Sequence, residues 1–173
     1  MRKVQITTPR FFLRSLTVDD ATARYSSWFD EVTSSKYITA AQSDHGVESL
    51  RAYIMKREGR DDVLFLGIFT RHGHEHIGNI KFEPLNIVHG YAVMGMLIGE
   101  CAWRGKSVAE EVIQHSAAWL QRTWGIGEIL LGVARDNPAA ISAYEKAGFK
   151  REQTKRIVID PASAISMVLH LDA

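Results

Sequence analysis

Residues 91–134 hold the sequence feature that most constrains the fold: an apolar strand, a basic loop, a long amphipathic helix and a second apolar strand. In the helix, predicted from Ser107 to Trp124, apolar residues recur three and four positions apart, and Gly125 ends it. The second strand, 129–134, is apolar almost throughout, as buried strands are. Two strands joined by a crossover helix run parallel. This unit therefore predicts a sheet with a parallel pair and a helix packed on one face.

The residues before this unit predict an antiparallel meander. Three apolar runs, 63–70, 77–83 and 91–99, are separated by short turns. Gly95 lies inside the third run and predicts a bulge or a close approach of another backbone. Because the third strand of the meander also begins the parallel pair, a single mixed sheet is expected.

Further helices and strands are expected at both ends of the chain. In order, they are a strand at 11–13, a helix from a capping box at Thr17 towards Trp28, a helix capped by Ser43 or Asp44 and ended by Gly59, a helix capped by Asn137 that begins at Pro138 and is ended by Gly148, and strands at 149–159 and 165–171. The predicted fold class is α+β. It has one domain, 1–173, whose mixed sheet of about six or seven strands begins as an antiparallel meander, continues as a parallel pair and carries helices on both faces.

Composition argues against several classes of protein. Apolar residues make up 46% of the sequence and charged residues 24%, as in an ordinary globular protein. The net charge of +1 does not favour a nucleic acid partner, and no apolar run is long enough to cross a membrane. The single cysteine, Cys101, excludes an internal disulfide and is typical of a reducing compartment. We expect a cytoplasmic protein with no nucleic acid or membrane partner.

A metal site is not expected, although three histidines lie close together in the sequence. His72, His74 and His76 alternate in a predicted turn, so their side chains could project to one side. A turn containing Gly73 does not hold that alternation rigidly, and no carboxylate or Cys is spaced to complete a tetrahedral site. We interpret these residues as a solvated turn.

The loop before the long helix predicts an anion site. The first N–H groups of a helix have no intrahelical partner, and the helix dipole adds partial positive charge there. Arg104 and Lys106 add full positive charges. The loop therefore predicts a ligand that carries phosphate.

A Walker A loop is one alternative for this stretch. Gly105, Lys106 and Ser107 match the end of G-x-x-x-x-G-K-[ST], but the first Gly would have to replace Glu100. The motif also follows the first strand of a parallel sheet, whereas a meander comes first here. The sequence thus argues against an NTPase.

Two segments resemble motifs of the GNAT superfamily of acetyl-CoA-dependent N-acetyltransferases. Residues 104–109, Arg-Gly-Lys-Ser-Val-Ala, resemble Q/R-x-x-G-x-G/A, and residues 137–149 resemble N-x-x-(A/S)-x-x-x-Y-E-K-x-G-F. Residues 10–14, Arg-Phe-Phe-Leu-Arg, are similar to the start of the Rim-type, ribosomal-protein-alanine acetyltransferase-like branch. The motifs occur in order with fitting elements between them, so the resemblance covers nearly the whole chain.

The resemblance implies acetyl-CoA as co-substrate and no metal. The CoA pyrophosphate would bind the loop amides, and the pantetheine arm would lie along the strand that ends the meander, next to a backbone splayed by a bulge near Gly95. The residues implied for cofactor binding are Leu97, Ile98, Arg104, Gly105, Lys106, Ser107, Val108, Ala109 and Asn137.

The resemblance also implies catalytic roles. Tyr144 would approach the sulfur and give a proton to the departing thiolate, because a tyrosine with a pKa of about 10 is protonated at neutral pH. A base must take a proton from the amine, directly or through water. Glu83 and Glu100 are the first candidates, and His89 and His45 come after them. The alternative for each glutamate is a solvated or salt-bridged carboxylate.

Ser107 departs from the motif, which has Gly at this position. Gly permits a positive φ, which costs Ser conformational energy. Ser is, however, a favourable helix N-cap, and its hydroxyl can bond a phosphate. We expect cofactor binding to survive this substitution.

The acceptor is less constrained than the cofactor. The resemblance implies a primary amine: a small molecule such as an amino sugar or amino acid derivative, or a protein N-terminus. A non-catalytic acyl-CoA sensor or scaffold of the same fold is the alternative function. Edge strands and the apolar C-terminal strand permit a homodimer.

Overall fold

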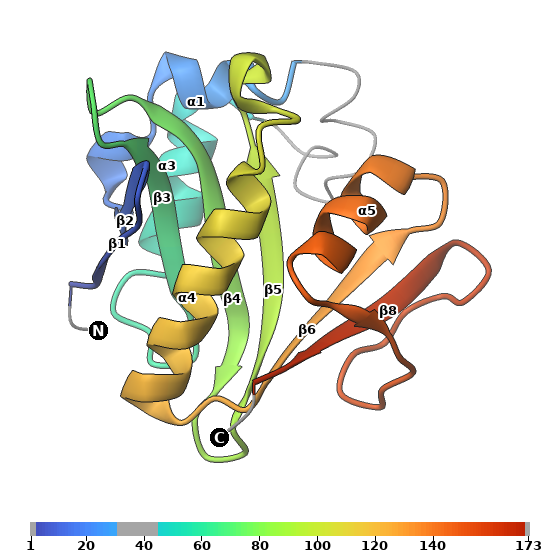
Figure 1. Ribbon diagram of the computed structural model, residues 1–173. Helices are drawn as coiled ribbons and strands as arrows, with labels where there is room; N and C mark the ends of the chain where they lie inside the picture. Colours follow the sequence, from blue (N-terminus) through green and yellow to red (C-terminus); the bar gives the residue numbers. More distant parts are fainter. Residues whose placement is uncertain (1–2, 31–44, 172–173) are drawn as a thin grey trace.

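Figure 1 shows the computed structural model, which describes residues 3–30 and 45–171. Within these ranges, eight strands form one sheet in the order β1-β2-β3-β4-β5-β6-β8-β7. The elements are β1 (Gln5–Thr7), β2 (Phe11–Ser15), the 3-10 helix η1 (Val18–Asp20), α1 (Ala23–Ser27), α3 (Val47–Met55), β3 (Leu64–Thr70), β4 (His76–Asn86), β5 (Tyr91–Ile98), the 3-10 helix η3 (Cys101–Trp103), α4 (Val108–Trp124), β6 (Glu128–Ala134), α5 (Pro138–Lys146), β7 (Lys150–Arg151) and β8 (Ala164–His170).

The predicted mixed sheet with helices on both faces is confirmed. Strands β3, β4 and β5 form the antiparallel meander, and β5 pairs with β6 in parallel. Helices α4 and α5 cover one face of the sheet, and α1 and α3 lie on the other (Figure 1). No helix among the described residues is both long and apolar enough to cross a membrane.

Each face of the sheet has its own apolar core. On one face, the buried stripe of α4 packs against the inner side chains of the strands, and its members include Val112, Ile113 and Leu120. On the other face, α1 and α3 share a smaller core, in which Tyr25 and Trp28 are both only 3% exposed. Tyr25, Trp28 and Phe29, which lie three and four positions apart in the sequence, therefore belong to this core.

The first helical segment is broken where the sequence predicts a continuous helix. A 3-10 turn ends at Asp20, whose carboxylate accepts hydrogen bonds from the Arg14 guanidinium at 2.6 and 2.8 Å and from the Thr17 N–H at 2.8 Å. A second N-cap then starts α1, because the Thr22 hydroxyl accepts the N–H of Tyr25. Helix α3 has Gly46 as its N-cap, and the predicted caps at Ser43 and Asp44 lie outside the described residues.

The two edges of the sheet differ from the prediction. At one edge, three-residue β1 is too short to show a pattern in the sequence, and only Ile6 in it is buried. At the other, the strand predicted over 149–159 is reduced to Lys150–Arg151. The charged and polar residues that follow present no apolar alternation to a neighbouring strand, so pairing stops there.

The irregularity between β4 and β5 lies on β4 and not at Gly95. Phe82 pairs with Met94 and Leu85 with Ala92, so two residues of β4, Glu83 and Pro84, face one residue of β5. Proline has no N–H to donate to the ladder, which explains why the pairing breaks there. Gly95 itself lies in regular register with Lys81. The bulge predicted near Gly95 is therefore corrected to Glu83 and Pro84.

Strands β5 and β6 separate soon after they meet. They pair in parallel only from Tyr91 to Val93, opposite Glu128 to Leu130. Beyond Val93 the strands diverge (Figure 1), and in the described part of the chain no strand pairs with that edge of β5. The separation opens the sheet at the C-terminal end of β5.

Candidate functional site

A cleft of about 510 Å³ lies where β5 and β6 diverge, between the N-terminal half of α4 and helix α5. This volume suits a small molecule or cofactor. The described residues that line it are Met96, Leu97, Ile98, Trp103, Arg104, Gly105, Ser107, Val108, Ala109, Glu110, Gly132, Val133, Ala134, Asn137, Ala139, Ala140, Ser142, Ala143, Tyr144 and Lys146.

Most of the residues predicted for cofactor binding meet in this cleft. Leu97 and Ile98 come from β5, residues 104–109 except Lys106 come from the loop and the first turn of α4, and Asn137 comes from the start of α5. Tyr144 lines the cleft from α5, whereas Glu83 and Glu100 are not among its described lining residues. Segments 40 positions apart in the sequence are thus brought to one cleft.

The loop before α4 turns through two left-handed residues. Gly105 has φ +71°, and Ser107, the N-cap of α4, has φ +55°. Ser107 occupies the predicted N-cap position, but its hydroxyl makes no capping hydrogen bond, so that part of the prediction is wrong. The first-turn N–H groups therefore receive no cap from Ser107, and within the described residues they keep their capacity to bind an anion.

The edge of β5 offers backbone groups to an extended ligand. Because β6 leaves β5 after Val93, the edge of β5 from Met96 to Ile98 borders the cleft, and alternate residues there present backbone groups on the side where a neighbouring strand would pair. An extended chain of amide groups can bind such an edge as an added strand does.

The start of α5 is capped by its own sequence. The Asn137 side-chain oxygen accepts the N–H of Ala140 at 3.2 Å, and Pro138 follows at the first helical position, as predicted. The side-chain nitrogen of Asn137 has no hydrogen-bond partner among the described residues. It is therefore available to a ligand.

Tyr144 lies on α5 and lines the cleft. Its ring packs on the Phe149 ring, with the centroids 5.8 Å apart. Burial raises the pKa of the Tyr144 phenol to about 12, since desolvation disfavours the phenolate. In the described part of the chain no group hydrogen-bonds to its hydroxyl. The group is a neutral donor at physiological pH.

The two predicted cations of the loop have different surroundings. The Arg104 guanidinium donates to the carbonyls of Ile98 and Gly99 at 3.1 and 3.0 Å, and to the sulfur of Cys101. It fixes the turn that leads out of β5. Lys106 is exposed, with its Nζ 5.5 Å from the centroid of the Trp103 ring. Its charge lies outside the described lining of the cleft.

Glu83 is enclosed by cations. Its carboxylate lies 2.8 Å from Arg57 Nε, 3.0 Å from Arg60 Nη1 and 3.0 Å from Lys81 Nζ. Although burial acts in the opposite direction, these partners lower the pKa of Glu83, Lys81 most strongly. A carboxylate with a lowered pKa is a weak base.

Glu100 ties α1 to the end of β5. Its Oε1 accepts the Arg24 Nε–H at 2.7 Å and the Trp28 indole N–H at 2.8 Å. The hydrogen bond from Arg24 lowers the pKa of Glu100. Gly99 permits this contact, because a Cβ there would lie 2.0 Å from the Trp28 ring. Both carboxylates considered as bases are thus hydrogen-bonded and ion-paired.

Two charged residues that line the cleft were not predicted from the sequence as site residues. Glu110 lies in the first turn of α4, and Lys146 lies in the last turn of α5. The second motif contains Lys146, which is the one signal that could have found it. Glu110 has the ordinary pattern of an exposed residue in an amphipathic helix, and only the path of the loop places it in the cleft.

The three nearby histidines do not share one environment. His74 lies in the turn between β3 and β4, whereas His76 begins β4 and packs against Phe69, Trp28 and Tyr25. Burial lowers the pKa of His76, and its Nε2 lies 2.8 Å from Asn79 Oδ1. The prediction of a solvated turn is therefore wrong for His76. Within residues 3–30 and 45–171, no group of three or more His, Cys, Asp or Glu side chains could hold a metal.

Comparison with protein families gives one match. The family described as "Acetyltransferase (GNAT) domain" matches residues 10–150, a range that contains the loop, the cleft and Tyr144. A comparison with curated protein sequences gives no match.

Solved structures resemble this chain in fold over almost its whole length. RimL, a ribosomal-protein alpha-N-acetyltransferase in complex with coenzyme A, has a TM-score of 0.81 at 15% identity, covering 98% of this chain and 99% of its own. A chimera of the Vibrio cholerae spermidine N-acetyltransferase SpeG and hSSAT has a TM-score of 0.76 at 19% identity, covering 92% and 95%. AAC(6′)-Ib in complex with paromomycin and acetyl-CoA has a TM-score of 0.71 at 21% identity, covering 92% and 93%.

Proposed function

This chain belongs to the GNAT acetyltransferase family, and we propose that it transfers an acetyl group from acetyl-CoA to a primary amine by direct attack on the thioester. The cleft between β5 and β6 carries this proposal. The start of α4, which its N-cap side chain does not cap, lies at one end of the cleft. Tyr144, whose hydroxyl has no hydrogen-bond partner among the described residues, lines its wall. Coenzyme A or acetyl-CoA accompanies two of the three structures of similar fold described above.

In this proposal, the cofactor follows the cleft from α4 to Tyr144. Its pyrophosphate binds the N–H groups of the loop and of the first turn of α4, where the helix dipole favours negative charge. Its pantetheine amides pair with the β5 backbone at Leu97 and Ile98, and Asn137 donates its side-chain N–H from the opposite wall. The thioester then lies near Tyr144.

The chemistry needs one bond made, one bond broken and one proton moved. The neutral amine attacks the thioester carbonyl, and the C–S bond breaks as the amide forms. Tyr144 donates its hydroxyl proton towards the sulfur as negative charge develops there, and coenzyme A leaves as the thiol. The proton that the amine loses replaces the one that Tyr144 has given. The products are the N-acetylated amine and coenzyme A.

A dedicated base remains a prediction for Glu83 or Glu100. Their lowered pKa values and ion pairs favour the structural interpretation of each carboxylate, with water taking the proton from the amine. Glu83→Gln and Glu100→Gln would separate the two possibilities. If either carboxylate is the base, its amide variant loses about 100-fold or more in kcat with an unchanged KM for acetyl-CoA.

The acceptor is proposed only as a class. The similar structures include acetyltransferases named for spermidine and for a ribosomal protein, and also AAC(6′)-Ib in complex with paromomycin. We retain a small amine, such as an amino sugar or amino acid derivative, as the first candidate and a protein N-terminus as the second. The chain that acts on this acceptor would be a single domain, 1–173.

A thiol-release assay with acetyl-CoA across a panel of amines tests this function. Turnover with at least one amine, giving one thiol for each acetylated product, is the expected result. The alternative is an acyl-CoA sensor or scaffold of the same fold. Tight binding of acetyl-CoA, measured by calorimetry, without release on any amine of the panel would favour the sensor.

A further inference from the structure

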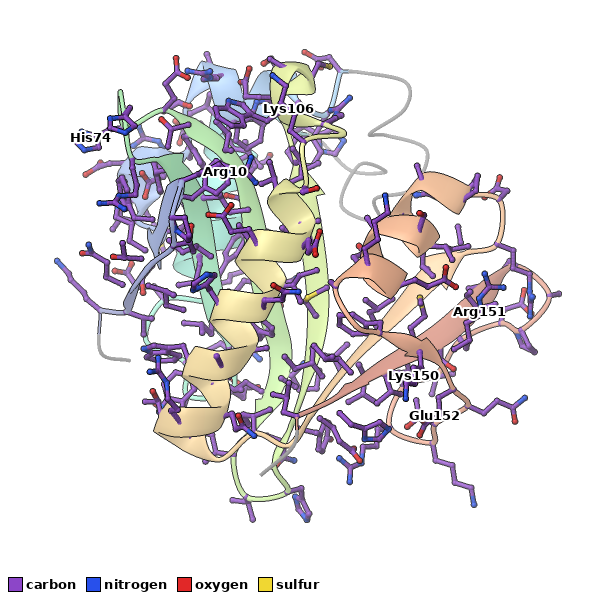
Figure 2. All side chains as sticks on the ribbon, in the orientation of Figure 1. Arg10, His74, Lys106, Lys150, Arg151 and Glu152 are labelled. Atoms are coloured by element: carbon purple, nitrogen blue, oxygen red, sulfur yellow. The ribbon has the colours of Figure 1, made fainter. Side chains whose placement is uncertain are left out.

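Arg10, in the turn between β1 and β2, contacts the loop that begins α4. Its Nη1–H donates to the Lys106 carbonyl at 2.9 Å, and its Nη2–H donates to the Ser107 carbonyl at 3.3 Å. Figure 2 shows Arg10 and Lys106 at the N-terminal end of α4. One guanidinium therefore holds two successive peptide groups of the loop, although it is 96 and 97 positions away in the sequence.

A second set of contacts fixes Arg10. The Glu111 carboxylate accepts the Arg10 Nε–H at 2.6 Å through one oxygen and the Arg10 backbone N–H at 2.8 Å through the other. The hydroxyl of Thr8 donates to that second oxygen at 2.6 Å. The side chain of Glu111 is only 13% exposed, so the assembly is partly shielded from solvent. Because Glu111 balances its charge, Arg10 acts on the loop mainly through its two hydrogen bonds.

The loop needs such support because of Ser107. Its φ of +55° is a conformation that L-residues with a side chain adopt at a cost, and its hydroxyl makes no capping bond that would offset that cost. Glycine would adopt it freely. The carbonyls held by Arg10 belong to Ser107 and to the residue before it, so their hydrogen bonds fix the orientation of the peptides on either side of Ser107.

We propose that Arg10 is a positioning residue for the anion-binding loop, which holds Ser107 in the left-handed conformation that a glycine would adopt without help. The inference rests on the proposed function in that the anion is the pyrophosphate of CoA. Arg10 is not among the described residues that line the cleft, so its effect passes through the backbone of Lys106 and Ser107.

A double-mutant cycle tests this coupling. Acetyl-CoA affinity is measured by calorimetry for the wild type, Arg10→Ala, Ser107→Gly and the double variant. We expect Arg10→Ala to weaken binding about tenfold when Ser107 is present, and about twofold or less when Gly replaces it, since contacting residues couple by such amounts. Equal losses in the two backgrounds would overturn the proposal.

Two further variants separate positioning from charge. Arg10→Lys keeps the positive charge but loses the fork that reaches two carbonyls, so it should recover only part of the affinity. Binding equal to the wild type would overturn the proposal, because charge alone would then suffice. Arg122→Ala, in the last turn of α4, is the matched control: among the described residues, this arginine hydrogen-bonds to the carbonyl of Ala118 in the same helix and to no other group. It should leave acetyl-CoA affinity unchanged.

Amide hydrogen exchange in the ligand-free protein separates this proposal from the proposed function. Arg10→Ala should speed exchange of the loop amides 105–109 several-fold, and Ser107→Gly should remove most of that difference. If the wild type did not bind acetyl-CoA, the proposed function would fail, and the exchange data would still decide the role of Arg10. Where thermal melts show that Arg10→Ala has unfolded, Arg10→Gln replaces it in the same cycle. Unchanged exchange in a folded variant would overturn the proposal.

Discussion

The two helices that border the cleft begin in opposite ways. Helix α5 starts with a cap supplied by its own sequence, since Asn137 accepts the N–H of Ala140. Helix α4 starts at Ser107 with no side-chain cap, and its entry loop is held by Arg10 from the far end of the sequence. One wall of the cleft is locally determined, and the other depends on a long-range contact.

The difference follows from what each wall offers a ligand. A capped helix start has used one of its first N–H groups, so α5 contributes side chains, Asn137 and Tyr144, to the cleft. A start without a side-chain cap keeps its N–H groups for an anion, so α4 contributes backbone. Because the cap that would stabilise the loop of α4 is absent, its support comes from elsewhere in the fold.

The largest expected effect is on the α5 wall. Tyr144→Phe removes the hydroxyl that donates to the sulfur, so kcat should fall about 100-fold or more while the KM for acetyl-CoA changes little. The ring still packs on Phe149, so the melting temperature should not change. Steady-state thiol release measures both parameters. An unchanged kcat would remove Tyr144 from the mechanism.

The pH dependence of kcat gives an independent check of Tyr144. Its pKa is raised to about 12, so the phenol stays protonated and competent as an acid at every pH below that value. The wild-type profile should therefore show no alkaline loss that can be assigned to Tyr144 below about pH 11. A loss near pH 8 or 9 that disappears in Tyr144→Phe would contradict the assignment.

A smaller effect is expected where α5 begins. Asn137→Ala removes both the cap and the donor to pantetheine, and should lower the free energy of unfolding by about 1 kcal/mol and acetyl-CoA affinity about fivefold. Asn137→Asp is the companion variant, because it keeps the capping oxygen and replaces the N–H donor by a charged oxygen that cannot donate. Thermal melts should then match the wild type while calorimetry still shows weaker binding. If Asn137→Asp bound acetyl-CoA as the wild type does, the amide would have no role in the cleft.

As the pH falls, the start of α4 should lose amide protection before the start of α5 does. Hydrogen bonds from Thr8 and Arg10 hold the pKa of Glu111 below its usual value of 4.5, against the effect of burial. The hydrogen bonds to the Glu111 carboxylate therefore stabilise the folded state fully above that value. This stabilisation is lost as the pH falls through the lower pKa that Glu111 has in the folded state. Between pH 6 and about 3.5, amide protection at the start of α4 should fall about threefold relative to that of α5.

The internal comparison of the two helices controls for acid effects elsewhere in the molecule, since the pKa values of Asp20, Glu83 and Glu100 are also lowered. In Glu111→Gln the difference between the helices should no longer depend on pH. Equal loosening of both helix starts in the wild type would show that the carboxylate does not hold the α4 wall.

The smallest expected effect concerns Glu110, a negative charge in the cleft beside the proposed pyrophosphate. Glu110→Gln should strengthen acetyl-CoA binding about twofold, an effect that salt reduces. Glu145→Gln, on the exposed surface of α5 and paired with Arg151, is a control at a position outside the described lining. Weaker binding by Glu110→Gln would place the pyrophosphate elsewhere.

Much of the fold and of the candidate site could be predicted from the sequence. The period of the apolar residues in α4, the turns of the meander and the two motifs predict the mixed sheet, the cleft-lining loop and the cap at Asn137, because each depends on residues a few positions apart. The short edge strands were missed or overextended for the same reason, since strands of three and two residues carry too little pattern.

The tertiary structure decided what depends on distant partners. The sequence alone could not show that Arg57, Arg60 and Lys81 surround Glu83, or that Arg24 and Trp28 hold Glu100, because the fold brings these groups together. Ser107 shows the limit most clearly. The residues around Ser107 in the sequence favour a serine that caps the helix. In the structure Ser107 is left-handed, and Arg10 donates a hydrogen bond to its carbonyl. Local patterns determine where a helix begins, and long-range hydrogen bonds determine which backbone conformation it begins with.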